Sequence, residues 1–146
     1  MTSAGGQFVT LMLAGQLFGI PVLQVRDILR EQRITRVPLA SPEIAGSLNL
    51  RGRIVTAIDM RRRLRLPPPP ADARAMSVVI EWDGELYALL VDQVCEVLSL
   101  DAARFESNPP TLAPDRARYC AGLHRLETNL MLVLDLDRLL SLAFAA

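Results

Sequence analysis

The chain has 146 residues and a mass of 16.1 kDa, which suits one domain or two small lobes that share a core. Hydrophobic residues make up 51% of it and charged residues 22%, so the chain can bury a core and is not a disordered protein. Sixteen basic residues, all arginine, balance sixteen acidic ones, and only 5% of the residues are aromatic. Zero net charge and few stacking side chains argue against a nucleic-acid-binding protein.

The first predicted elements form a β-hairpin. Residues 1–6 are expected to be a frayed tail, and the apolar run at 8–13 predicts a strand. A turn at 14–16 leads to a second strand over 17–22, and Pro21 suits the end of that strand.

The next elements in the chain are a helical stretch, a strand, a linker and another strand. Val22, Val25, Ile28 and Leu29 recur at a helical spacing, which predicts one short helical stretch. The β-branched residues at 54–58 predict a strand, and another strand is predicted at 76–82. Between these two strands, the four consecutive prolines at 67–70 predict a stiff, extended linker that cannot lie inside a sheet.

The linker separates two halves that resemble each other. The halves cover residues 8–66 and 76–142, with the linker at 67–75, so we expect a single domain over 1–146 that is built by duplication. Because neither half is large enough to be stable alone, the contact between them should be apolar and permanent. The repeat predicts an all-β fold of two small pseudo-symmetric barrels with short helices. The matching segments are Gly15–Val22 with Gly84–Val91, Val25, Asp27 and Ile28 with Val94, Glu96 and Val97, Ala45–Gly46 with Ala121–Gly122, and Ile54–Asp59 with Leu130–Asp135.

Features that both halves share are expected to be structural. Asp59 and Asp135 each end a strand just before a helical run, at 60–64 and 136–140, which is where an N-cap carboxylate is wanted. A pair of catalytic carboxylates is the weaker interpretation.

Features of one half alone are candidates for a functional site. The main one is Asn49-Leu50-Arg51-Gly52, whose counterpart at 125–128 shares only the leucine. Asn49 and Gly52 tolerate positive φ and can bracket a tight bend that projects Arg51 outward. The bend is either an ordinary turn with a solvated arginine, or a rigid turn that holds an arginine in position to bind a partner's carboxylate or carbonyl groups.

Catalytic and metal chemistry finds little support in the sequence. Cys95 and Cys120 form no metal-binding pair and are expected to be buried thiols, and His124 is expected to be a surface or packing residue. The run Arg61–Arg65 reads as the solvated face of a short helix. We therefore expect no metal, no cofactor and no enzymatic activity. The sequence shows no secretory signal and no apolar run long enough to cross a bilayer, so we expect a cytoplasmic protein.

Three blocks of the sequence resemble the CheW-like chemotaxis coupling proteins. They are F-G-I-P-V-x-x-V-R-D-I at Phe18–Ile28, I-A-G-S-L-N-L-R-G-R-I-V-x-x-I-D-M-R at Ile44–Arg61 and V-D-x-V-x-E-V at Val91–Val97. The resemblance implies two SH3-like, five-stranded β-barrels around a shared apolar core. It also implies a non-catalytic adaptor that joins the cytoplasmic tip of a chemoreceptor to the regulatory domain of the histidine kinase CheA. Such an adaptor works in a membrane-attached receptor array, without nucleic acid and without direct insertion into the membrane.

The resemblance also implies site residues. Asn49, Leu50, Arg51 and Gly52 match the turn motif of the family, and Val25 and Asp27 match positions associated with receptor binding, although Glu is common where this chain has Asp27. Three more positions resemble part of a groove between the barrels, or equally packing positions: Val94, Glu96 and Val97.

Thr56-Ala57, Met60 and the tetraproline depart from the family pattern, so the sequence does not identify the pathway that the protein serves. The alternative function is a regulatory β-barrel that binds a small ligand. A single-stranded nucleic-acid binder comes third and an enzyme last.

Overall fold

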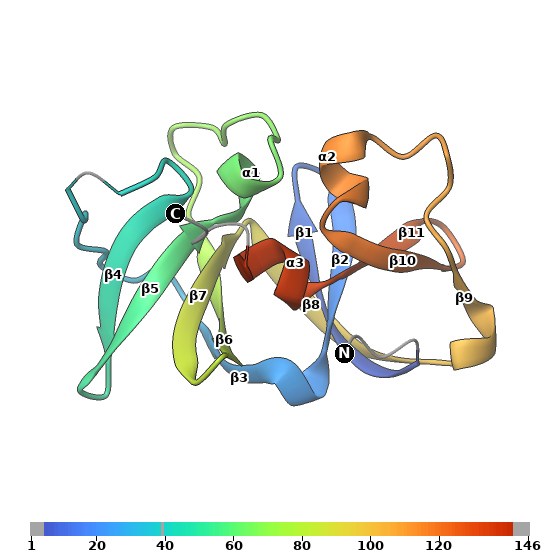
Figure 1. Cartoon of the computed structure of the whole chain (residues 1–146), viewed down its shortest axis with the longest axis horizontal. Coiled ribbons are helices and arrows are strands. Elements are labelled where there is room, and N and C mark those ends of the chain that lie inside the picture. The colour runs from blue at the N-terminus through green and yellow to red at the C-terminus, as the bar shows by residue number, and fades with distance from the viewer. Residues whose placement is uncertain (1–4, 39, 142–146) are drawn as a thin grey trace.

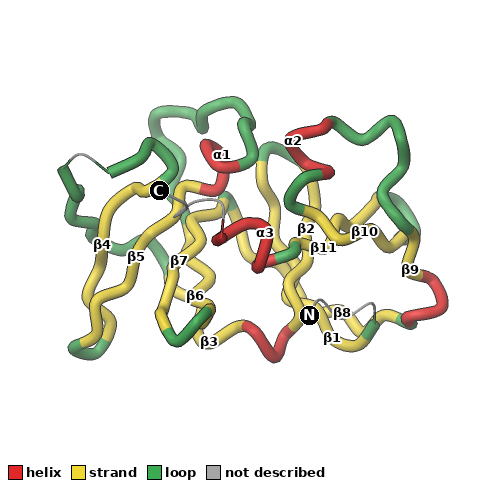
Figure 2. Tube along the Cα trace, viewed as in Figure 1, coloured by secondary structure: helices red, strands yellow, loops and turns green. Residues whose placement is uncertain are grey.

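The computed structural model describes residues 5–38 and 40–141, and its described part consists mainly of strands (Figures 1 and 2). Most of the expected tail lies outside the described residues, but Gly6 already belongs to the first strand. The expected strand at 76–82 is present with those bounds. The strands are β1 (Gly6–Leu13), β2 (Gln16–Pro21), β3 (Val25–Leu29), β4 (Ile44–Leu50), β5 (Arg53–Asp59), β6 (Met76–Trp82), β7 (Glu85–Val91), β8 (Gln93–Leu100), β9 (Phe105–Glu106), β10 (Cys120–Arg125) and β11 (Leu130–Leu134). The helices are η1 (Val22–Gln24), α1 (Met60–Arg63), η2 (Ala102–Arg104), α2 (Pro114–Ala117) and α3 (Leu136–Ser141).

The strands form two sheets, and each sheet draws strands from both halves of the sequence. One sheet has the order β3-β6-β7-β5-β4 and, with α1, makes lobe I; the other has the order β8-β1-β2-β11-β10-β9 and, with α2 and α3, makes lobe II. The hairpin β1–β2 thus leaves its own half to pair with β8 and β11, while β6–β7 pairs with β3 and β5. A lobe of the structure is therefore not the same as a half of the sequence, because the two halves have exchanged their hairpins.

The two lobes repeat the same topology. In each, a central hairpin lies between an antiparallel strand (β3 or β8) and a parallel one (β5 or β11). After β3 in lobe I and β8 in lobe II, the chain crosses to the far edge of the same sheet. There β9 pairs with β10 in lobe II, and Thr35 bridges Ser47 in lobe I. The sixth strand of lobe II is thus the continuation of β8, and both lobes have the five-stranded SH3-like form that the resemblance implies.

The helical stretch predicted over 22–29 is wrong. Only Val22–Gln24 is helical, as a single 3-10 turn, and β3 follows it at once. Half-buried and exposed residues alternate along β3, which is the period of a strand. The strand carries a β-bulge at Arg26, and β8 carries one at the equivalent place, between Val94 and Val97. The apolar residue Ile28 occupies an exposed position of this alternation, next to the half-buried Leu29, which explains the misleading helical spacing.

One apolar core runs through both lobes. Its largest cluster joins residues of lobe I with residues of lobe II and of α3, which lies between the lobes (Figure 1). Each lobe also has a smaller buried cluster of its own, but the largest cluster is shared, so the lobes pack as one unit. Fully buried members include Leu11, Phe18, Ile20, Ile58, Val78, Ile80, Leu89, Leu134, Leu139 and Leu140.

The duplicated aspartates are N-caps, as predicted. Asp59 Oδ1 accepts from the backbone N–H of Arg62 at 3.2 Å, and Asp135 Oδ1 accepts from that of Arg138 at 3.3 Å. The helices that follow are short, α1 and α3, and each turns the chain away from the end of its strand.

The prediction that Arg61–Arg65 forms a solvated face is confirmed for Arg62 and Arg65, which are exposed, and is wrong for Arg61 and Arg63, which connect the two lobes. The Arg61 guanidinium donates twice to the carboxylate of Asp92, at 2.8 Å and 2.6 Å, and Asp92 also accepts from the backbone N–H of Ala14 in lobe II at 2.8 Å. The hydrogen bonds that Arg61 donates to Asp92 raise the pKa of Arg61 above its usual value. These contacts tie α1 to the turn between β1 and β2.

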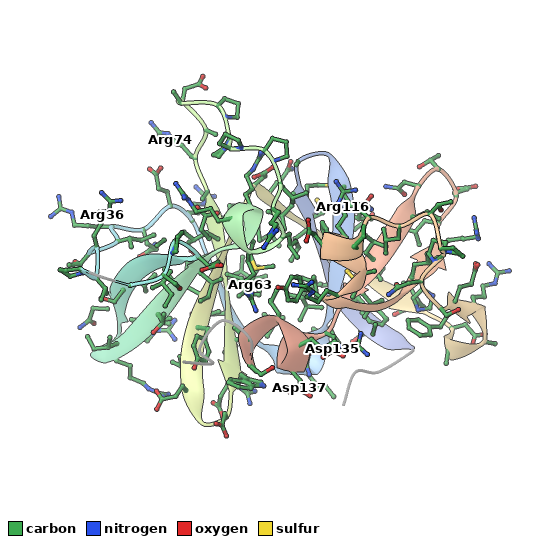
Figure 3. The ribbon with its side chains drawn as sticks, turned by 45° about the horizontal axis from the view of Figure 1, so that its top comes forward. Arg36, Arg63, Arg74, Arg116, Asp135 and Asp137 are labelled. Atoms are coloured by element: carbon green, nitrogen blue, oxygen red, sulfur yellow. The ribbon has the colours of Figure 1, made fainter. Side chains whose placement is uncertain are left out.

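Arg63 forms the second connection between the lobes. It lies near the centre of the molecule, whereas Arg36 and Arg74 project from outer loops (Figure 3). Arg63 is buried; its Nε donates to the backbone carbonyl of Leu139 at 2.9 Å, and its guanidinium lies 4.6 Å from the centre of the Tyr119 ring. The residues near Arg63 in the chain could not predict its burial, because both of its partners lie far away in the sequence.

Candidate functional site

The motif Asn49-Leu50-Arg51-Gly52 forms the turn between β4 and β5. Leu50 pairs with Arg53, and Arg51 and Gly52 are the two loop residues, with φ of 53° and 85°. The side-chain oxygen Oδ1 of Asn49 accepts from the backbone N–H of Gly52 at 2.9 Å. Two successive positive φ values characterise the type I′ turn of two-residue hairpins. The expected bracketing of the bend is thus corrected: the left-handed residues are Arg51 and Gly52, and Asn49 braces the turn from within β4.

The backbone of this turn is not peculiar to the motif. Ala14–Gly15 and Asp83–Gly84 join two other hairpins with nearly the same φ values. The backbone conformation of Arg51 is therefore the usual one for a two-residue hairpin turn in this protein. The functional candidate is the side chain of Arg51.

The structure brings Arg51 and Asp27 together. Nη2 of Arg51 lies 3.1 Å from Oδ2 of Asp27, while Oδ1 of Asp27 accepts from the backbone N–H of Ile28 at 2.8 Å. Asp27 belongs to β3 and Arg51 follows β4, the two end strands of the lobe I sheet. Only the rolling of the sheet into a barrel makes these two side chains neighbours.

The two side chains of this ion pair differ in exposure. The side chain of Arg51 is 79% exposed and that of Asp27 is 25% exposed, and both line a depression of about 170 Å³. Such an exposed pair adds about 1 kcal/mol or less to stability. A guanidinium has five N–H donors and only Nη2 of Arg51 lies near Asp27, so donors remain for a carbonyl or carboxylate of another molecule.

The other residues of the motif and of the β3 block hold this pair in place. Val25 is half-buried and packs on the shared core, and Leu50 is half-buried against the core of lobe I. Asn49 is exposed and is engaged with the turn. Of these residues, Arg51 has the most exposed side chain, whereas Val25 and Leu50 are held by packing and Asn49 by its hydrogen bond to the turn.

The predicted groove residues Val94, Glu96 and Val97 lie on β8 in lobe II and do not join the Arg51–Asp27 pair. Val94 packs against the shared core. Glu96 lines a separate surface hollow of about 650 Å³, together with His124 and Glu127. By the repeat, Glu96 and Glu127 occupy the positions of Asp27 and Arg51, so lobe II has two acidic residues where lobe I has an ion pair.

Sequence reasoning missed the exposed apolar residues beside the pair. Ile28 is 41% exposed, and Val97 at the equivalent position of β8 is 50% exposed. Leu23, in the turn before β3, and Ile54, opposite Asn49, are also exposed. A signal existed, because a strand assignment for 25–29 would have placed Ile28 on the opposite face from Val25.

The histidine and the buried cysteine, which could in principle act as a base or a nucleophile, have structural roles. His124 is buried and lies between the rings of Phe8 and Phe105, with centroids 5.6 Å and 5.5 Å away, in agreement with a packing role. Cys120 is buried, which raises the pKa of its thiol to about 12. The expectation that both thiols are buried is wrong for Cys95, which is exposed on β8.

Among residues 5–38 and 40–141, no three His, Cys, Asp or Glu side chains gather as a metal site would need. The helices in this part of the chain are all too short to cross a membrane.

Comparison with known proteins gives a consistent result. The CheW-like domain family matches residues 7–144. The Chemotaxis protein CheW of Klebsiella aerogenes is 29% identical over 139 residues, which cover 95% of this chain and 84% of that protein. The protein of the same name in Bacillus subtilis is 29% identical over 136 residues, covering 93% and 87%. The crystal structure of the scaffolding protein TtCheW from Thermoanaerobacter tengcongensis superposes with a TM-score of 0.84 at 26% identity, covering 92% of this chain and 87% of that one.

Proposed function

We propose that this chain, which belongs to the CheW-like domain family, couples the cytoplasmic tips of chemoreceptors to the regulatory domain of the histidine kinase CheA. Its relatives and its structural neighbour support the broader function of a non-catalytic chemotaxis scaffold. In this proposal the protein works inside a membrane-attached receptor array, needs no cofactor and catalyses no reaction.

The observation that carries the proposal is the exposed Arg51–Asp27 pair. Arg51 presents its donors on a hairpin that the Asn49 hydrogen bond braces, and the half-buried Asp27 of β3 lies beside it. Complementary polar groups on a rigid mount fix the orientation of a partner more than they raise its affinity. Each contact can be weak, because many copies act together in an array.

Exposed apolar residues next to the pair would supply most of the binding energy. Ile28 follows Asp27 directly in β3, Leu23 lies in the turn before β3, and Ile54 lies on β5 near the turn. A helical receptor tip places apolar side chains at i, i+3 and i+4 on one face, which suits a surface of this kind. In the proposal the apolar residues bind the helix, and Arg51 and Asp27 set its register.

The test is Arg51→Glu in a reconstituted assay with receptor, kinase and this protein. The substitution places two carboxylates together at the partner surface, so we expect loss of receptor-dependent kinase stimulation. The melting temperature should change by less than about 3 °C, because an exposed pair contributes little to folding. Arg74→Glu, the same charge change on the exposed loop after the tetraproline, is the control and should behave as the unchanged protein.

Normal stimulation by the Arg51→Glu protein would remove this pair from the site. Titration with the kinase regulatory domain separates the proposal from the small-ligand alternative, which requires no complex between the two proteins.

A further inference from the structure

The depression beside Arg51 holds more positive than negative charge. Arginine, aspartate and glutamate side chains line it from β3, from the β4–β5 hairpin and from β6. Because three of them are arginines and two are acids, this end of lobe I has a net positive charge. The five charged residues are Arg26, Asp27, Arg51, Arg53 and Glu81.

Both acids of the depression already have partners. Oδ2 of Asp27 lies 3.1 Å from Nη2 of Arg51. Oε1 of Glu81 lies 3.6 Å from Nε of Arg26. Arg53 is exposed, and within residues 5–38 and 40–141 no ion pair or hydrogen bond engages its side chain. The surplus positive charge of the depression therefore belongs to Arg53.

The hairpin holds Arg53 close to Arg51. Arg53 is the first residue of β5 and pairs with Leu50. Only Gly52 separates it from Arg51 in the chain, and the hydrogen bond from Gly52 to Asn49 braces the turn that joins them. Two guanidiniums on one braced hairpin can bind two neighbouring carboxylates, because arginine forms strong charge-assisted hydrogen bonds with these groups.

The corresponding end of lobe II carries the opposite surplus. By the repeat, Glu127 stands in the place of Arg51 and Asn129 in the place of Arg53. The hollow there is also lined by five arginine, aspartate and glutamate residues, but three of them are acids. A segment with several carboxylates is therefore attracted by lobe I and repelled by lobe II. The five charged residues of lobe II are Glu96, Asp101, Arg104, Arg125 and Glu127.

We infer that Arg53 determines which partner segment lobe I accepts: together with Arg51 it binds a segment that presents two neighbouring carboxylates, and the acids of lobe II keep that segment from the second lobe. The inference rests on the proposed function, in which a receptor tip binds beside Arg51 and Asp27, and it adds the chemistry of that tip. Arg53 is then a specificity residue of the surface.

The test is calorimetric titration of the full chain with a soluble fragment of the receptor tip, at low and at high salt. Arg53→Glu should raise the dissociation constant about tenfold at low salt, because one attraction becomes a repulsion. The increase should shrink at high salt, where exposed charges are screened. The melting temperature should change by less than about 3 °C, since Arg53 has no ion pair to lose.

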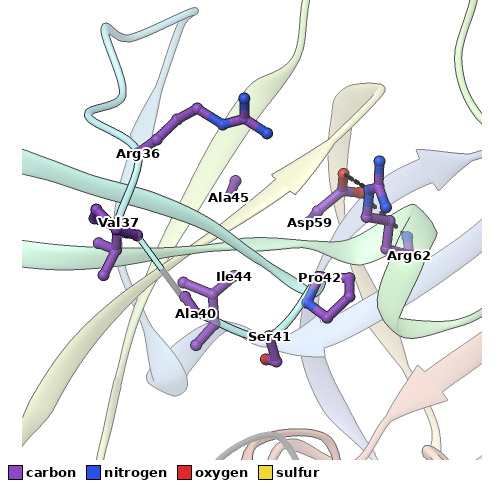
Figure 4. Close-up of a pocket in the computed structure, with 10 residues that line it drawn as sticks. Arg36, Val37, Ala40, Ser41, Pro42, Ile44, Ala45, Asp59 and Arg62 are labelled. Carbon is purple, nitrogen blue, oxygen red and sulfur yellow. Dashed lines mark hydrogen bonds and ion pairs between the residues drawn. The ribbon is translucent and has the colours of Figure 1, made fainter.

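The matched control is Arg36→Glu, the same charge change at another exposed arginine beside the β4–β5 hairpin. Figure 4 shows Arg36 lining a different hollow, together with Asp59 at the end of β5 and Arg62 in α1. That end of the hairpin is about 20 Å along β4 from the Arg51 turn, so this substitution should leave the dissociation constant unchanged.

An exchange of charges identifies the group that Arg53 binds. Each acidic residue of the receptor fragment is changed to lysine in turn and titrated against the Arg53→Glu protein. One of these lysines should restore the affinity for the Arg53→Glu protein and weaken binding to the unchanged protein, which a merely structural role of Arg53 would not produce.

Three results would overturn the inference: an Arg53→Glu protein that binds like the Arg36→Glu control, an effect that salt does not weaken, or no lysine that restores binding. If Arg51→Glu abolishes kinase stimulation while Arg53→Glu changes nothing, this inference alone fails. If Arg51→Glu stimulates normally, or the receptor fragment does not bind the unchanged protein, the proposed function fails and the inference with it.

Discussion

Asp92 offers the sharpest test of how the two lobes are joined. Its carboxylate accepts two hydrogen bonds from Arg61 and one from the backbone of Ala14, so Asp92→Asn would leave the Arg61 guanidinium, whose side chain is only 14% exposed, without its counter-ion. Hydrogen bonds to charged groups contribute about 1.5–3 kcal/mol each. Because Asp92 is 32% exposed and Asn keeps one acceptor, we expect a loss of about 2 kcal/mol. The melting temperature should fall by roughly 6 °C.

The loss should depend on pH. Burial alone would raise the pKa of Asp92, but the hydrogen bonds from Arg61 and Ala14 and the charge of Arg61 outweigh burial and lower that pKa. The unfolded chain then holds this proton more tightly than the folded chain does. The stabilisation is therefore fully present above the unfolded value of about 3.9, and it disappears as the pH falls through the lower folded value.

Urea unfolding of both proteins between pH 7 and pH 3 measures the effect. The difference in unfolding free energy should be about 2 kcal/mol at pH 7 and should shrink at the acidic end. Asp72→Asn, in the exposed loop after the prolines, is the control and should cost nothing measurable. A difference that stays constant with pH, or that is below about 0.5 kcal/mol at pH 7, would refute the reasoning about this ion pair.

Two further pairs of changes test the fold. In Gly122→Ala, the new Cβ would collide with the backbone carbonyl of Glu106, so we expect the unfolding free energy in urea to fall by about 2–3 kcal/mol. Gly15→Ala, at φ 80° with open space around it, should lower the unfolding free energy by about 1 kcal/mol. Equal losses for the two proteins would contradict this picture. A thiol reagent should modify Cys95 in the native protein and Cys120 only after unfolding, because Cys120 is buried and its pKa is raised to about 12; rapid native modification of both would show that β10 is not covered as described.

Local patterns predicted much of the fold correctly. Apolar runs bounded by turn residues placed the strand at 76–82, and the position of Asp59 and Asp135 after a strand predicted their capping role. These features depend on neighbours in the chain, so the residues alone specify them. The helical assignment of 22–29 failed because the apolar residue Ile28 lies at an exposed position of β3, so the apolar residues do not follow the alternation that distinguishes a strand from a helix.

The arginines show where local reasoning stops. Arg61 and Arg63 read as a solvated run because their neighbours are polar, yet their partners Asp92 and Leu139 lie far along the chain. Burial of a charged side chain depends on an ion pair or acceptor supplied by another element, which no window of the sequence contains.

For this protein, the sequence by itself determined the duplication, the all-β class, the turn at Arg51 and the family to which the chain belongs, since each depends on residue types at fixed spacing. Only the tertiary structure decided that the two halves exchange hairpins and that Arg51 meets Asp27. The reason is geometric: β3 and β4 are the two ends of one sheet, and they approach each other only when the sheet rolls into a barrel.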